Sequence, residues 1–500
     1  MTPFSRLFLT LATLAVCSPA MAADRPNIVW IIVDDMSAHF ACYGETLIAT
    51  PHVDQLAREG VQFNKAFVTA PVCSTCRSAF ITGMYQTSIG AHHHRSGRGV
   101  EKIHLPSGVE LVPAMFQKAG YFTTIGSWPP SGANGKNKRL GKTDYNFEYD
   151  KAVYNGNDWS DRKDGQPFFA QIQLPGGKLR GGKAAQQKKF LERVKKKFGD
   201  VTAPTSVTLP PYYPRDPVLL DDWAAYLDSV RMTDAVVGEI VARLKKEGVY
   251  DNTMLLFMTD HGISHARGKQ FLYEEGIHVP LVICGPSIKA GTKRNDLVEH
   301  IDIAALSLAA AGIKRPKTMQ AKDVLAEGYQ QREFIVSARD RCDETVEHMR
   351  CVRSKRFKYI RNFLPNRPHL QPCAYKDAKD ILIALRKANS NGRLNTLQQQ
   401  LFVATRPKEE LYDLDGDPHE IRNLASDPQM QTTLIKMRGQ LNDWMERTDD
   451  KGRVAESAKM YNSDMAVYVE KIRNRQRYPG HLKTIQTNIA TMKRWAKEGR

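Results

Sequence analysis

After its first 22 residues, the 500-residue sequence lacks any apolar run long enough to cross a bilayer, which predicts no stable membrane insertion. It also lacks an internal repeat and a nucleic-acid-binding motif, and its cysteines are few, eight in all. Basic residues outnumber acidic ones by 72 to 54, a formal net charge of +18. This excess favours an anionic partner, and the missing motif indicates that the partner is not nucleic acid.

The start of the chain has the pattern of a secretory signal peptide. Arg6 gives a positive charge, residues 7–16 are apolar, and Ala-Met-Ala at 20–22 is a small-residue cleavage site. The apolar stretch is too short to span a bilayer. We therefore expect a periplasmic or secreted protein. That compartment permits disulfides, for example between Cys342 and Cys351, and free thiols are the equally acceptable alternative.

Strand and helix patterns alternate through the first part of the chain. Residues 27–33 and 253–258 are apolar runs that predict buried strands, and residues 222–246 have apolar residues at helical spacing. Such alternation predicts parallel strands with helices on both faces. We expect an α/β fold whose large domain has a mostly parallel central sheet flanked by helices, with a smaller C-terminal α+β domain. The expected division is a signal peptide at 1–22, a catalytic domain at 23–330, a smaller domain at 331–450 and a basic helical extension at 451–500.

Acidic residues follow two of these predicted strands. Asp34 and Asp35 come directly after the first strand, and Asp260 and His261 follow the strand at 253–258. Because ligands bind beyond the carboxyl ends of parallel strands, we expect the four side chains to surround one cation. Three carboxylates favour a hard cation such as calcium, whereas the imidazole leaves manganese or zinc open. Either pair alone is also compatible with a strand-end turn.

Cys73 opens the run Cys-Ser-Thr-Cys-Arg, which continues through small and apolar residues to Thr-Gly at 82–83. The run resembles the signature of the type I sulfatases, which belong to the alkaline-phosphatase-like superfamily. In that family a maturation enzyme oxidises the cysteine to formylglycine, whose hydrated aldehyde attacks the sulfur of a sulfate ester. Thr75 stands where the usual pattern has Pro or Ala. The alternative is a buried, unmodified Cys73 beside a possible disulfide partner, Cys76.

The resemblance covers residues 26–316 and 339–424 and implies roles for several side chains. In the family the metal is usually calcium, and the formylglycine is one of its ligands. The arginine of the run hydrogen-bonds the formylglycine, and two lysines hold the sulfate and stabilise developing charge. The catalytic residues implied here are Cys73, Arg77, Lys142 and Lys269, and the implied metal ligands are Asp34, Asp35, Cys73, Asp260 and His261.

Two positions depart from the family pattern. Asp144 and Pro175 stand where many sulfatases have a histidine, and in the family the second of these histidines commonly binds sulfate or protonates the leaving alcohol. His265, four residues before the second lysine, is a candidate general acid. The histidine triplet at 92–94 is another, and His93 and His94 are predicted to contact substrate. For each of these histidines, a polar surface position is the alternative.

Basic runs point to the substrate. Residues 176–198 carry nine Lys or Arg against one acid, and residues 451–500 carry twelve against four. Such runs are usually solvated faces, but they also raise the local concentration of a polyanion. Lys178, Arg339 and Arg341 are further predicted substrate contacts.

The resemblance thus implies a sulfatase that hydrolyses sulfate esters, or N-sulfates, of a sulfated carbohydrate, with formylglycine at Cys73 and calcium, or manganese, as metal. The expected partners are a sulfated glycan and a formylglycine-generating maturation enzyme. Two alternatives remain: a formylglycine-dependent phosphonate or phosphodiester hydrolase, and a non-catalytic polyanion-binding relative.

Overall fold

The computed structural model describes residues 25–130 and 139–500. The predicted signal peptide at 1–22 lies outside the described residues. Within the described ranges, every helix is either too short or too polar to cross a membrane. The seven cysteines of this part are all free thiols, Cys342 and Cys351 among them.

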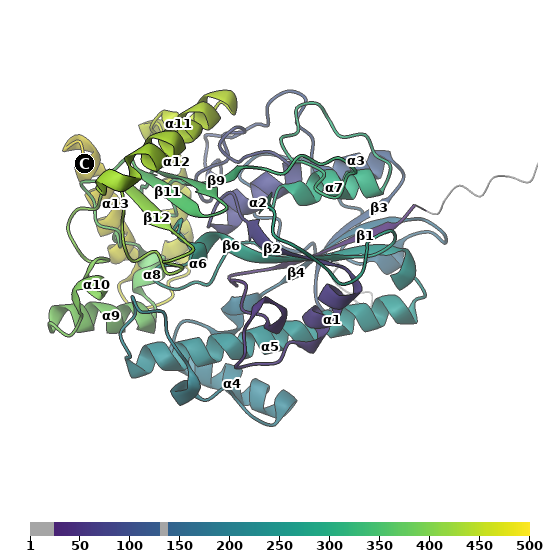
Figure 1. The fold of residues 1–500 in the computed structure, drawn as a ribbon, viewed down its shortest axis with the longest axis horizontal. Helices are drawn as coiled ribbons and strands as arrows, with labels where there is room; N and C mark the ends of the chain where they lie inside the picture. Colours follow the sequence, from purple (N-terminus) through teal and green to yellow (C-terminus); the bar gives the residue numbers. More distant parts are fainter. Residues whose placement is uncertain (1–24, 131–138) are drawn as a thin grey trace, which may run out of the picture.

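An eight-stranded sheet forms the centre of the molecule (Figure 1). Its order is β3-β4-β1-β5-β6-β2-β7, with β8 beside β2. The strands are β1 (Asn27–Val33), β2 (Val61–Phe67), β3 (Phe122–Ser127), β4 (Phe168–Leu174), β5 (Thr253–Thr259), β6 (His278–Cys284), β7 (Thr292–Arg294) and β8 (Val298–Glu299). Among these described strands, every pairing is parallel except those of β6 with β5 and with β2. The prediction of a mostly parallel sheet is confirmed.

Helices cover both faces of this sheet (Figure 1). On one face lie α1 (Pro51–Glu59), α4 (Ala184–Phe198) and α5 (Pro217–Lys246), and on the other α2 (Cys73–Thr82), α3 (Val112–Lys118) and α7 (Asp302–Ala310). β1, β4 and β5 are buried along their whole length, which explains their continuous apolar sequences. α5 begins five residues before the predicted start, because Asp216 accepts a hydrogen bond from the Val218 N–H and Pro217 fits the first helical position.

A smaller, antiparallel sheet follows, in the order β12-β11-β10-β9. Its strands are β9 (Phe334–Arg339), β10 (Met349–Ser354), β11 (Phe357–Asn362) and β12 (Glu409–Asp413). The remaining helices are α6 (Glu274–Ile277), α8 (Ala374–Asp377), α9 (Asp380–Ser390), α10 (Thr396–Gln399), α11 (Gln431–Arg447), α12 (Ala458–Asn474) and α13 (His481–Lys497). α11 buries Leu434, Leu441 and Trp444 against this sheet. The α/β class with a smaller C-terminal sheet is thereby confirmed.

Candidate functional site

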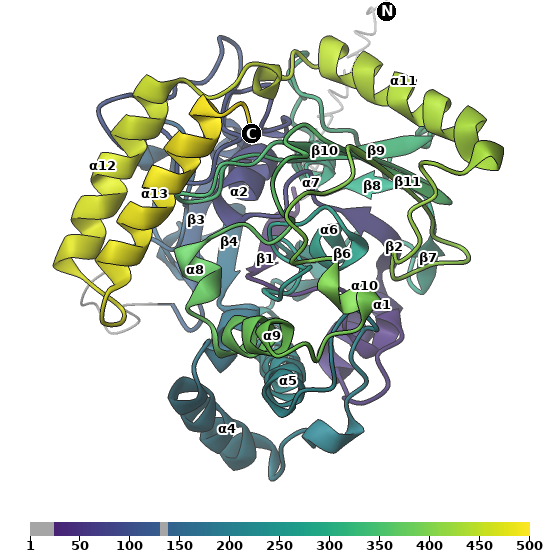
Figure 2. The same ribbon diagram turned by 90° about the vertical axis from the view of Figure 1, so that its left-hand side faces the viewer.

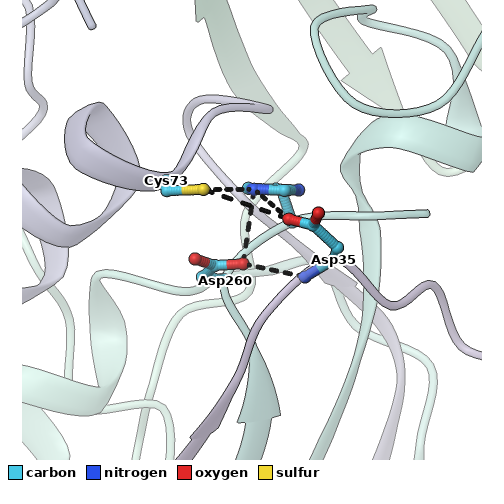
Figure 3. Close-up of side chains that lie close together, drawn as sticks. Asp35, Cys73 and Asp260 are labelled. Carbon is cyan, nitrogen blue, oxygen red and sulfur yellow. Dashed lines mark hydrogen bonds and ion pairs between the residues drawn. The ribbon is translucent and has the colours of Figure 1, made fainter. Parts of the chain in front are cut away.

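Four potential metal ligands meet at the carboxyl ends of β1 and β5. The ligand atoms of Asp35, Cys73, Asp260 and His261 all lie within 4.8 Å of one another, and all four residues are buried. Figure 3 shows Asp35 at the end of β1, Asp260 at the end of β5 and Cys73 at the start of α2. The sheet explains this meeting, because β1 and β5 are parallel neighbours and end at the same edge.

The chemistry of this donor set fits a divalent cation. His261 Nε2 lies 3.3 Å from Asp35 Oδ1 and 3.4 Å from Asp260 Oδ1, and 3.0 Å from Cys73 Sγ. Burial, together with the negative charge of Asp34, raises the pKa of Asp260 to about 7. Buried carboxylates held this close repel each other, and a bound cation relieves the repulsion. The four residues could therefore hold a metal ion together.

Asp34, the fifth predicted ligand, lies beside this cluster and contacts cations. Its carboxylate is 2.5 Å from Arg77 Nη2, 3.1 Å from Lys142 Nζ and 2.5 Å from Lys178 Nζ. Burial alone raises the pKa of Asp34, but attraction to Lys178, Lys142 and Arg77 outweighs it and holds the pKa well below its usual range. In this structure Asp34 therefore pairs with three cationic side chains and holds them next to the donor cluster.

Arg77 lies one helical turn after Cys73, so α2 presents both side chains on the same face. The Arg77 guanidinium is buried and donates to Asp34, to Asp260 Oδ2 at 3.1 Å and to Gln173. It thus holds together the ends of β1, β4 and β5. The four-residue spacing between the cysteine and the arginine is explained by this geometry.

Lys178 reaches the site because two glycines let its loop approach β1. The short 3-10 helix η4 (Gly176–Arg180) follows β4, and a Cβ at either Gly176 or Gly177 would come within 2.2 Å of the backbone oxygen of Asp34 or Asp35. Gly176 also has φ +50°, which favours glycine. The sequence Pro-Gly-Gly-Lys, which stands where many sulfatases have a histidine, therefore brings an ammonium group to the site.

The Cys73 thiol is surrounded by ammonium groups at the N-terminus of α2. Its Sγ lies 3.2 Å from Lys269 Nζ and 3.8 Å from Lys178 Nζ. Burial raises the pKa of this thiol, but Lys142, Lys178 and Lys269 together bring the pKa well below its usual value. The position is thus suited to a nucleophile next to a bound anion.

A cavity of about 470 Å³ opens above Cys73. Of the predicted residues, it is lined by Asp35, Cys73, His94, Lys142, Lys178 and Lys269. The prediction missed several other lining residues, among them Arg95, Tyr375, Lys379, Lys471 and Arg477. Lys471 and Arg477 belong to the basic run at 451–500. The sequence identified this run, but it did not indicate that the run lies at the cavity. For Tyr375 the sequence carried no signal.

The structure places His265 and His93 away from this cavity. His265 is fully buried, with its ring 4.6 Å from that of Tyr213 and 5.5 Å from that of Trp223, and its Nε2 is 3.5 Å from Asp222. His93 accepts a hydrogen bond from the Arg341 N–H. Neither is among the described residues that line the cavity. The general-acid prediction for His265 is therefore not supported by its position.

Arg339 and Arg341 are also engaged elsewhere. Arg341 forms buried ion pairs with Glu456 at 2.7 Å and Asp464 at 2.6 Å, and so ties the small sheet to the segment that contains α12. Arg339 donates to the backbone oxygen of Gln270. Neither arginine is among the described residues that line the cavity, so their positions do not support the predicted sugar contacts.

The comparisons with known proteins agree with this geometry. Residues 26–313 match the family model described as Sulfatase. The chain belongs to the sulfatase family. Residues 261–370 also match the model described as N-sulphoglucosamine sulphohydrolase, C-terminal. The family makes this protein a sulfuric ester hydrolase and implies a metal and a formylglycine.

Individual relatives cover most of the sulfatase. An ulvan-active sulfatase of Formosa agariphila is 31% identical over 473 residues, 87% of this chain and 77% of that protein. The human N-sulphoglucosamine sulphohydrolase is 25% identical over 497 residues, 88% of this chain and 93% of that protein. A solved structure in complex with its substrate, D-glucosamine-2-N,6-O-disulfate, has a TM-score of 0.57 at 17% identity and covers 85% of this chain and 98% of its own, which shows the shared fold.

Proposed function

We propose that this sulfatase removes sulfate from the O- or N-sulfated groups of a sulfated carbohydrate, with Cys73 matured to formylglycine. The convergence of Lys142, Lys178 and Lys269 around Cys73 carries the proposal, since three ammonium groups suit a sulfate group placed against a nucleophile. Two relatives are named for ulvan and for N-sulphoglucosamine, which supports a carbohydrate substrate.

Each part of the site has a proposed task. Asp35, Asp260 and His261, with residue 73, would hold the divalent cation, for which the carboxylates favour calcium, with manganese as the alternative. Formylglycine supplies, when formed, the hydrated aldehyde that acts as nucleophile. The lysines bind the sulfate oxygens and stabilise negative charge that builds up in the transition state. Arg77 holds the ends of the strands in a fixed position relative to residue 73.

The direct experiment combines maturation with a substrate screen. The full-length protein, with its predicted signal peptide, is produced together with a formylglycine-generating enzyme. It should release inorganic sulfate from sulfated glycans. Preferential hydrolysis of a phosphonate monoester or a phosphodiester would instead favour the phosphonate hydrolase alternative. Glycan binding without any turnover, at full conversion of Cys73, would favour the non-catalytic alternative.

Replacement of Lys269 by glutamine should lower kcat by about 100- to 1,000-fold, the usual cost of losing one preorganised donor to developing charge. The Lys269 ammonium is buried and 3.0 Å from Asp35, so bulk water cannot easily replace it. Steady-state kinetics of sulfate release provide the measurement. Lys317→Gln, at an exposed position, is the matched control. A Lys269→Gln enzyme with wild-type kcat would contradict the assigned role.

The basic runs should favour polymeric substrates. Attraction between a cationic surface and a polyanion weakens as salt shortens the screening length, about 10 Å at 0.1 M. We expect kcat/KM on a sulfated polysaccharide to fall several-fold between low and physiological salt, and that on a small monosulfate to change little. Lys188→Glu with Lys189→Glu, on the exposed side of α4, should reduce the advantage of the polymer. An equal response of both substrates would show that the runs are only solvated surface.

A further inference from the structure

The C-terminal helices α12 and α13 form a helical hairpin beside the catalytic cavity. Figure 2 shows the two helices side by side, next to α8. Tyr461 and Met465 of α12 pack against Met492 and Trp495 of α13 in one apolar cluster. A second cluster joins both helices to α8, through Ile472, Ile485 and Ala374. The hairpin is therefore fixed to the rest of the molecule by buried apolar contacts.

One end of this hairpin forms part of the cavity wall. Lys471 and Tyr468 of α12 and Arg477 and Tyr478 of the connecting loop line the same cavity as Cys73. The Lys471 and Arg477 side chains are exposed, and within the described ranges neither forms an ion pair with a carboxylate. Their charges are thus available to a ligand that enters the cavity.

Nearby acidic groups do not balance these charges. Arg95, which also lines the cavity, pairs with Asp343 at 3.4 Å, and Arg98 pairs with Asp144 at 2.5 Å. Partial burial, and then repulsion from Arg95, Arg98 and Arg477, lower the pKa of the Lys471 ammonium. A local excess of positive charge is unfavourable in the free protein, and an anion bound there would relieve it.

We propose that Lys471 and Arg477 bind a second anionic group of the substrate, while the sulfate to be removed lies against Cys73. The inference rests on the proposed function and narrows its substrate class to sugars that carry two acidic groups. The second group is either a carboxylate or another sulfate, since both are oxyanions that Arg and Lys recognise. The cavity volume is within the range of about 300–1,000 Å³ that is usual for sites that enclose a small ligand.

The aromatic side chains beside these cations suit a sugar. Tyr468 and Tyr478 are half-buried and line the cavity next to Lys471 and Arg477. A tyrosine ring offers an apolar face to the C–H groups of a sugar and a hydroxyl to its oxygens. The hairpin thus combines charge for the anionic group with flat surface for the ring that carries it.

The test compares three substrates on the matured enzyme: a monosulfated monosaccharide, a disaccharide with a second sulfate and a disaccharide with one sulfate and one carboxylate. In the Lys471→Gln, Arg477→Gln double variant, KM for at least one disaccharide should rise about fivefold or more, with kcat and the monosaccharide kinetics within twofold of wild type. Loss confined to the disulfated substrate identifies a sulfate site, loss confined to the other identifies a carboxylate site, and loss of both identifies a general oxyanion site. Lys436→Gln, on an exposed position of α11, should leave all three substrates unchanged.

A binding measurement separates this inference from the proposed function. Calorimetric titration of each disaccharide into Cys73→Ala protein requires no turnover, and the added double substitution should weaken the binding of at least one disaccharide about fivefold. If wild type releases no sulfate from any substrate but this weakening is seen, the proposed function fails and the anion site stands. Unchanged disaccharide binding and an unchanged KM ratio in the double variant would overturn the inference.

Discussion

Replacement of Cys73 by alanine should abolish turnover, with a loss of at least about 10⁴-fold, because loss of the nucleophile leaves only binding and electrostatic effects. The protein should still fold, since Cys73 forms no disulfide and its neighbours are held by other contacts. Its thermal midpoint should stay within a few degrees of wild type. Sulfate release gives the activity, and mass spectrometry of the tryptic peptide that contains Cys73 should show an aldehyde in the active parent.

Cys76→Ala is the matched control for this variant. Cys76 is fully buried and lies less than one turn further along α2, but it is not a cavity-lining residue, and burial raises its thiol pKa well above the usual value. Its replacement should cost some stability and keep activity in proportion to the formylglycine content. If active protein from its own host carried only a thiol or a disulfide at Cys73, the nucleophile assignment would be wrong.

The middle strands of the central sheet were predictable because they are buried along their whole length. Asn27–Val33 is an apolar, β-branched run that folds as β1 with the predicted ends, and β5 extends only one residue beyond the prediction, to Thr259. The direction of β6 was not predictable, because its apolar sequence carries no information on whether it runs with or against β5. The start of α5 depended on capping by Asp216 and not on apolar periodicity.

The site residues divide in the same way. Asp35, Asp260 and His261 follow strands directly, so the sheet alone places them, and Arg77 follows from helical spacing. His265 lies on a loop, and in a loop the spacing of residues along the sequence does not predict the direction of a side chain. The His265 ring packs against the rings of Tyr213 and Trp223, and this packing depends on residues that are distant in the sequence.

The lysines show what local sequence cannot convey. Lys178 and Lys269 meet at Cys73 although 91 residues separate them in the sequence. Lys178 can reach Cys73 because η4 lies close against the end of β1, and this close approach requires glycine at 176 and 177. In the same way Arg341 was identified by its charge, but the partners that bury it, Glu456 and Asp464, lie more than a hundred residues later.

Asp260→Ala should lose both the metal and activity. Asp260 is one of two carboxylates in the donor set, and its removal leaves Asp35, His261 and residue 73 to hold the cation. We expect elemental analysis to fall from about one divalent ion per chain to near zero, and kcat/KM to fall at least about 100-fold, since even residues that only orient metal ligands cost 10- to 100-fold. Calcium or manganese restored to chelated wild-type protein should recover activity and identify the metal.

Because Asp260 also accepts hydrogen bonds from Arg77, at 3.1 and 3.2 Å, loss of activity alone would not distinguish a metal ligand from a support for this arginine. Asp260→Asn separates the two roles. Its amide oxygen keeps an acceptor for Arg77 but removes the negative charge that holds a divalent cation, so metal content should fall as in Asp260→Ala. Asp251→Ala, at an exposed position, should leave the metal in place. Full metal occupancy in Asp260→Ala, whatever its activity, would show that the cation is held elsewhere.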